Sequence, residues 1–158
     1  MIHSFKNVII ASGLGLMSLT AASHAQVYYF EEDPNVHKAE LAVRAGDLIK
    51  AAQYYSRAAR SVSGEERLLP VLNTLCIVEY ANGNFEAAIE ACTKAVKTDR
   101  KYWQAYLNRG NAKRALGDMD GAVSDYNKAK KLNPKTALVN EALAGLLKET
   151  GKNYAEVH

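Results

Sequence analysis

Small and apolar residues recur three and four positions apart over most of the chain. Two stretches show this spacing most clearly, and they carry Ala88, Cys92 and Ala95, and then Ala122, Tyr126 and Ala129. This is the spacing of one face of an α-helix, whereas a half-buried strand would alternate at every second residue. The pattern predicts an all-α fold in which small side chains let neighbouring helices approach closely.

Glycines divide this pattern into units of one length. Gly83, Gly117 and Gly151 are each 34 residues apart, and a fainter copy of the unit begins at Gly46, 37 residues before Gly83. Each unit holds two runs with helical spacing. Glycine ends a helix readily because it accepts a positive φ. The sequence therefore predicts a series of helical hairpins of repeated design.

The unit Trp103–Thr136 resembles the tetratricopeptide repeat. The residues that carry the resemblance are Tyr106, Gly110, Leu116, Gly117, Asp118, Ala122, Tyr126, Ala129 and Pro134. The unit departs from the family at Arg109 and Lys113, where large apolar residues are usual. The resemblance implies a right-handed superhelical stack of antiparallel helix pairs. It places repeats at about residues 32–65, 69–102 and 103–136, and a capping helix at about 137–150.

The resemblance also implies a concave groove that binds a segment of a protein or peptide partner. By register, the groove-facing positions are Val36, Glu40, Val43, Arg44, Asn73, Ile77, Tyr80, Gln104, Leu107, Asn111, Arg114, Glu141 and Lys148. Apolar side chains among them would contact the partner, and the amides and Arg114 would hydrogen-bond it. Val36, Asn73 and Leu107 stand where some family members place a basic residue, so a carboxylate clamp is not expected. The alternative is a solvated surface with no single ligand.

Residues 1–25 have the pattern of a cleavable secretory signal. Lys6 precedes an apolar run from Val8 to Leu19, and small residues stand at Ser23 and Ala25. The run is too short to span a bilayer of roughly 30 Å as a helix. We therefore expect a cut after Ala25, a domain at residues 26–158 without a membrane span, and a periplasmic or secreted location. The alternative is an N-terminal anchor that is never cut.

The two cysteines leave two interpretations open. Export permits a disulfide between Cys76 and Cys92. The antiparallel helix register, however, places Cys92 about one turn from the level of Cys76, which favours two buried small residues instead. Outside the expected signal, histidine occurs only at His37 and His158, and neither has metal-ligand spacing. We therefore predict no metal site.

Charge and motifs narrow the function further. Twenty basic residues against 17 acidic ones give a formal net charge of +3, which is too small for a nucleic-acid-binding footprint. No motif of a hydrolase, a phosphate-binding loop or a metalloenzyme occurs. The sequence predicts no catalytic residue and no cofactor, and it favours a protein-interaction module of the bacterial cell envelope. The alternative is a self-associating structural component, since the last helix carries Leu138, Leu143, Leu146 and Leu147 and could form a homodimer.

Overall fold

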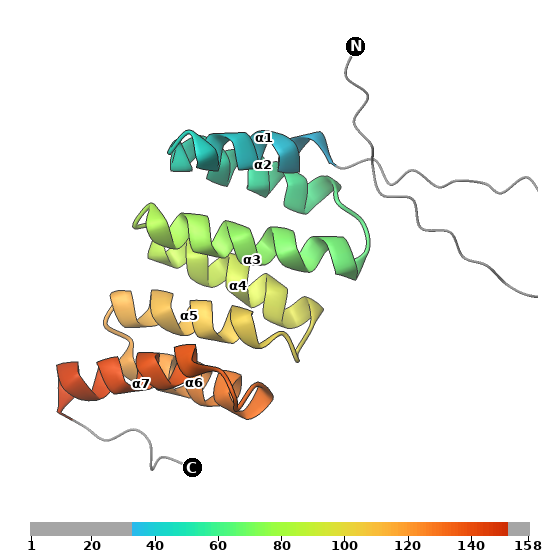
Figure 1. Cartoon of the computed structure of the whole chain (residues 1–158). Helices are drawn as coiled ribbons and strands as arrows, with labels where there is room; N and C mark the ends of the chain where they lie inside the picture. Colours follow the sequence, from blue (N-terminus) through green and yellow to red (C-terminus); the bar gives the residue numbers. More distant parts are fainter. Residues whose placement is uncertain (1–32, 152–158) are drawn as a thin grey trace, which may run out of the picture. The chain divides into compact units, whose positions relative to one another are not determined.

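The computed structural model describes residues 33–151, which form seven α-helices and no strand. The helices are α1 (Pro34–Arg44), α2 (Leu48–Ser61), α3 (Glu65–Ala81), α4 (Phe85–Thr98), α5 (Trp103–Ala115), α6 (Met119–Leu132) and α7 (Ala137–Thr150). Each packs against the next in the chain, and α3 also packs against α5. The pairs α1/α2, α3/α4 and α5/α6 follow one another, and α7 lies beside α6 at the end (Figure 1). The predicted all-α stack of helix pairs is confirmed.

The turn inside each hairpin is built in the same way along the stack. Gly83 and Gly117 have φ of +77° and +83°. The Gly83 amide donates to the Tyr80 carbonyl at 3.0 Å, and the Gly117 amide donates to the Arg114 carbonyl at 2.9 Å. These bonds satisfy carbonyls that the helix end leaves unpaired, in a geometry that residues with a Cβ atom adopt reluctantly. The glycines that recur in the sequence therefore mark the turns between the paired helices.

Small side chains form the seams between the helices. The alanines at the repeated positions are completely buried, as at Ala51, Ala58, Ala88, Ala95, Ala122 and Ala129. Tyr126 is the largest side chain without solvent exposure. The C-terminal end is closed by α7, whose Val139, Leu143 and Leu146 join Tyr126 in one core cluster. The last helix thus covers an apolar face that α5 and α6 would otherwise expose.

The closest helix contact predicts a strong effect of one added methyl group. A Cβ atom at Gly110 would lie 2.5 Å from Cε1 of the Tyr126 ring, which is fixed in the core. We expect Gly110→Ala to lower the free energy of unfolding by about 2 kcal/mol, measured by urea denaturation. Gly145→Ala is the comparison variant, because its Cβ atom would meet the guanidinium of the partly exposed Arg114–Glu149 pair and not a ring fixed in the core. Equal losses in the two variants would contradict this account.

Across residues 33–151, no helix is both long enough and apolar enough to cross a bilayer. The expected signal at residues 1–25 lies outside the described residues.

Candidate partner-binding groove

One face of α3 presents apolar side chains to solvent. Asn73, Ile77 and Tyr80 are spaced four and three residues apart, so they share that face. Ile77 is 46% exposed and Tyr80 is 41% exposed, although both are large apolar residues. Val43, near the end of α1, is similarly exposed. Exposed apolar side chains that share one helix face are typical of a contact surface for another protein.

Two amides that the sequence places in the groove are already hydrogen-bonded within the chain. Asn108 Nδ2 on α5 donates to Asn73 Oδ1 on α3 at 2.9 Å. The Tyr126 hydroxyl on α6 donates to Asn111 Oδ1 at 2.8 Å. Each bond uses one lone pair of the amide oxygen, while the amide NH₂ groups of Asn73 and Asn111 can still donate. These bonds fix the two side chains in place and leave part of their capacity for a partner.

Arg114 also has a partner of its own. Its Nε donates to Glu149 Oε2 on α7 at 2.9 Å, and its Nη2 contacts Glu149 Oε1. The hydrogen bonds raise the pKa of Arg114 and lower the pKa of Glu149. Gly145 leaves room for the guanidinium, because a Cβ atom there would lie 2.9 Å from Nη1. The sequence predicts that Arg114 hydrogen-bonds a partner, and the structure shows that a carboxylate of the chain itself already pairs with it.

The prediction for Leu107 needs correction. The sequence places it in the groove as an apolar contact, but it is only 8% exposed and packs in the core cluster with Val139 and Leu143 of α7. The last helix covers it. The other predicted groove residues vary in exposure: Val36, Glu40 and Gln104 are half-buried, whereas Arg44, Glu141 and Lys148 are exposed. The accessible apolar part of the predicted groove is therefore concentrated on α1 and α3.

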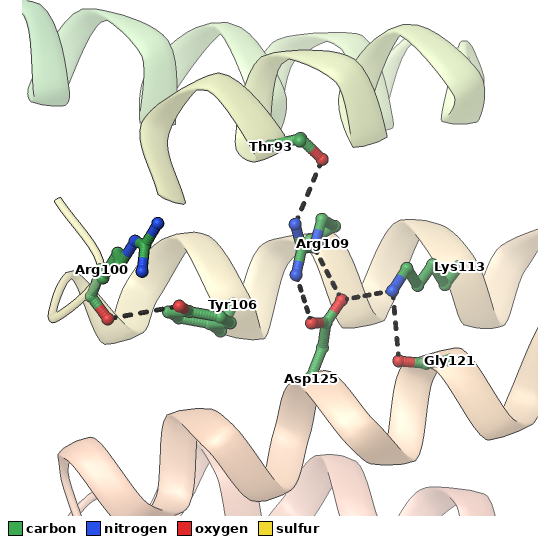
Figure 2. Close-up of polar contacts among 7 residues, drawn as sticks. All are labelled: Thr93, Arg100, Tyr106, Arg109, Lys113, Gly121 and Asp125. Carbon is green, nitrogen blue, oxygen red and sulfur yellow. Dashed lines mark hydrogen bonds and ion pairs between the residues drawn. The ribbon is translucent and has the colours of Figure 1, made fainter. Parts of the chain in front are cut away.

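A buried ionic network lies between α5 and α6, and the sequence alone did not reveal it. Arg109 donates from Nη2 to Asp125 Oδ1 at 2.6 Å and from Nε to Asp125 Oδ2 at 2.8 Å, while Lys113 Nζ lies 2.8 Å from Asp125 Oδ2 (Figure 2). Arg109 Nη1 also donates to Thr93 Oγ1 on α4 at 3.2 Å. Asp125 is 4% exposed, and its hydrogen bonds raise the pKa of Arg109. The network explains why Arg109 and Lys113 depart from the apolar family pattern.

Next to this network, Tyr106 on α5 contacts α6 through its ring and the turn between α4 and α5 through its hydroxyl. The hydroxyl donates to the Arg100 carbonyl at 3.2 Å (Figure 2). The Arg109 guanidinium lies 5.5 Å and the Lys128 ammonium 6.0 Å from the ring centroid. Cations at such distances are attracted by the ring quadrupole. Polar and aromatic side chains therefore fill the space between α4, α5 and α6.

Burial raises the pKa of Tyr126 to about 12. Since an exposed tyrosine titrates near 10, the stabilisation from the neutral Tyr126 is complete below pH 10 and is lost as the pH rises toward about 12. We expect the free energy of unfolding to fall over this range, and Tyr126→Phe to make the fall shallower. Urea denaturation at pH 9, 10, 11 and 12 measures both slopes. Identical slopes for the two proteins would contradict the assignment to Tyr126.

Cys76 and Cys92 form a disulfide. The Cα atoms are 5.3 Å apart, the S–S distance is 2.10 Å, and both side chains are completely buried. The expectation of two buried but separate cysteines was wrong. Packed helices are inclined to each other, so the levels that face one another are shifted from those of two parallel rods. The bond joins α3, which carries Ile77 and Tyr80, to α4.

No metal-binding group was found near the groove or elsewhere in the described part of the chain. Within residues 33–151, no three His, Cys, Asp or Glu side chains come together in an arrangement that could hold a metal ion. The groove positions offer three exposed apolar side chains, Val43, Ile77 and Tyr80, which we call the apolar strip, together with two amides and a paired arginine. Such a surface can bind a segment of another protein.

Comparison with known sequences gives one family and several distant relatives. The tetratricopeptide repeat family matches residues 75–137. The mouse protein named FK506-binding protein-like is 26% identical over 117 residues, which are 71% of this chain and 34% of the relative. The rice DnaJ protein P58IPK homolog B is 36% identical over 69 residues, which are 44% of this chain and 15% of the relative. The chain thus spans 34% of the first relative and 15% of the second.

Solved structures show the same architecture. The TPR domain of OM64 from Arabidopsis has a TM-score of 0.64 at 25% identity, over 73% of this chain and 93% of that one. The first TPR of Spaghetti (RPAP3), bound to the HSP90 peptide SRMEEVD, has a TM-score of 0.67 at 20% identity, over 75% and 91%. The fold is therefore a right-handed superhelical TPR stack. The family match and the shared architecture together show that residues 75–137 belong to the tetratricopeptide repeat family and that the described chain has its fold.

Proposed function

We propose that the chain is a protein-interaction module that binds a partner segment through the apolar strip of α1 and α3. The observation that carries the proposal is the exposure of Ile77 and Tyr80 on one helix face in the middle of the stack. A related fold, the first TPR of RPAP3, is seen with a bound HSP90 peptide. The same architecture therefore accommodates a peptide, and this chain supplies apolar anchors for one.

The chemistry of the groove favours apolar anchoring over recognition of a terminal carboxylate. Glu149 holds Arg114 by two contacts. An incoming carboxylate would have to displace Glu149, and the exchange of one carboxylate for another brings little net free energy. Apolar side chains of the partner, in contrast, would bury Ile77 and Tyr80, and the free energy of that burial would favour binding. We infer that the partner segment presents aliphatic or aromatic side chains, either as a strand-like segment or as an amphipathic helix.

The experiment compares crosslinking positions on the intact protein in its native cells. A photo-crosslinking amino acid at Ile77 or Tyr80 should give one discrete adduct, and the same group at exposed Ser124 on α6 should not. The added substitution Tyr80→Ala should reduce the Ile77 adduct severalfold, because about 1–3 kcal/mol of anchor burial is lost. Equal yields of adduct at Ile77 and Ser124 would contradict the proposal that the partner binds at the groove.

We propose that this module works outside the cytoplasm, in the bacterial cell envelope. Two features support an oxidising location: the secretory pattern of residues 1–25 and the buried Cys76–Cys92 disulfide. The N-terminus of the protein recovered from its native compartment tests the proposal. Mass spectrometry should show a chain that begins at Gln26. A chain that retains residues 1–25 would support the anchor alternative.

Self-association is the second candidate, and one observation favours it. Leu138 on the terminal helix α7 is 55% exposed, and an exposed apolar side chain at the end of a stack can bind a second copy. Multi-angle light scattering over a range of concentrations distinguishes the candidates. A dimer that Leu138→Glu converts to a monomer would support self-association, while a monomer at all concentrations would dismiss it.

A further inference from the structure

A second hollow surface lies away from the predicted groove residues. Where α2 and α4 flank the first half of α3 there is a cleft of about 450 Å³ with a leucine floor that includes Leu68, Leu72 and Leu75. A further hollow of about 340 Å³ shares Ser56 and Arg60 with it and adds Ile49, which is 68% exposed. None of the groove residues predicted from the sequence lines either hollow. The two hollows together extend along α2 and could hold a segment several residues long.

The repeat register explains why this cleft is open. Leu75 and Ala91 stand 34 residues before Arg109 and Asp125, and Ser56 stands 37 residues before Thr93. One repeat further along, Arg109 crosses the corresponding space and contacts both Thr93 on α4 and Asp125 on α6 (Figure 2). Leu75 has no donor for the Ser56 hydroxyl, and Ala91 has no carboxylate, so neither bond can form in this repeat. The side chains that fill the space between α4 and α6 therefore have no counterpart between α2 and α4.

The rim of the cleft is basic. Arg60, Lys94 and Lys97 line it, and its described lining includes no acidic residue. Lys94 pairs with Glu90 at 2.7 Å, an exposed contact of the kind that adds little stability. Arg60 and Lys97 are exposed at opposite sides of the leucine floor, one on α2 and the other on α4. Apolar side chains below and cations on both sides are complementary to an acidic amphipathic segment.

We propose that this cleft is a second docking site, which binds a partner segment that carries both apolar side chains and carboxylates. The apolar side chains lie against Leu68 and its neighbours, and the carboxylates face Arg60 and Lys97. The site is independent of the groove on α1 and α3, and it does not rest on the function proposed above. With both sites occupied, the chain would bridge two partners.

Two synthetic peptides of opposite charge test the proposal on the full chain. Both are amphipathic helices of about 12 residues with leucine at i, i+3, i+4 and i+7. One carries glutamate at the other positions and the other carries lysine. We expect the acidic peptide to shift the amide NMR signals of Ser56, Ala59, Leu68 and Lys97 and the basic peptide to leave them unchanged. Equal binding of the two peptides, or shifts confined to Ile77 and Tyr80, would overturn the proposal.

Variants at exposed positions complete the test without disturbing the core. Lys97→Glu and Arg60→Glu should each weaken binding of the acidic peptide about fivefold. Lys131→Glu is the matched control, because Lys131 is exposed at the same register one repeat later. Ser56→Trp should fill the cleft and abolish binding. The proposal is wrong if Lys131→Glu weakens binding as much as Lys97→Glu does, or if Ser56→Trp binds normally.

Discussion

Replacement of Asp125 by alanine is expected to lower the free energy of unfolding by about 3 kcal/mol. The side chains of Arg109 and Lys113 are 16% and 22% exposed, and both point at Asp125, whose side chain is 5% exposed. Without the carboxylate, two cations would face each other in a space that water reaches poorly. The measurement is urea denaturation of Asp125→Ala at neutral pH. A loss below about 1 kcal/mol would show that the unpaired Arg109 and Lys113 side chains carry no large penalty.

A double variant separates the penalty of unpaired charge from the value of the network. Arg109→Leu combined with Asp125→Ala reproduces Leu75 and Ala91, which occupy these positions one repeat earlier. Because an apolar replacement of a buried ion pair is often neutral or stabilising, we expect the double variant to recover most of the loss. Lys113 can turn toward solvent. A double variant as unstable as Asp125→Ala would contradict this expectation. It would show that the hydrogen bonds between Arg109 and Asp125 stabilise the fold of the native protein.

The sequence predicted the fold because the fold depends on local and repeated features. A positive φ at Gly83 and Gly117 ends one helix of a pair, and the buried alanines set how closely the helices approach. Both requirements appear directly in the order of residues. The fold therefore survives the irregular spacing before Gly83 and the polar residues at Arg109 and Lys113, since neither removes a turn or a seam.

The details of the candidate site depend on how helices that are far apart in the sequence pack together, and residue spacing does not predict this packing. Ile77 and Tyr80 are exposed as the helix register predicted, because their position depends on α3 alone. Leu107 and Arg114 differ from the prediction because both are covered or paired by α7. Asp125 was missed because its partners, Arg109 and Lys113, lie on α5, and a lone aspartate next to Ser124 resembles a solvated position.

Reduction of the Cys76–Cys92 disulfide is expected to lower the free energy of unfolding by about 3 kcal/mol. The bond closes a loop with a sequence separation of 16 residues, and a loop of this size restricts the unfolded chain by about that amount. For a domain of this length the midpoint of thermal unfolding should fall by about 10 °C. Thermal and urea denaturation with and without a reductant measure both quantities. The double variant Cys76→Ala with Cys92→Ala should be insensitive to reductant.

The effect of reduction should be strongest in the helices that carry the apolar strip. In a stack of repeats each helix pair contacts only its neighbours, so the loss of one bond weakens mainly the pair that contains it. Amide hydrogen exchange should accelerate in α3 and α4 and much less in α6. Because Ile77 follows Cys76 directly, a loosened α3 would also weaken partner binding at the groove. Uniform acceleration of exchange over all helices would instead show that the stack unfolds as one unit. Partner binding that is unchanged by reduction would show that the groove does not depend on the disulfide.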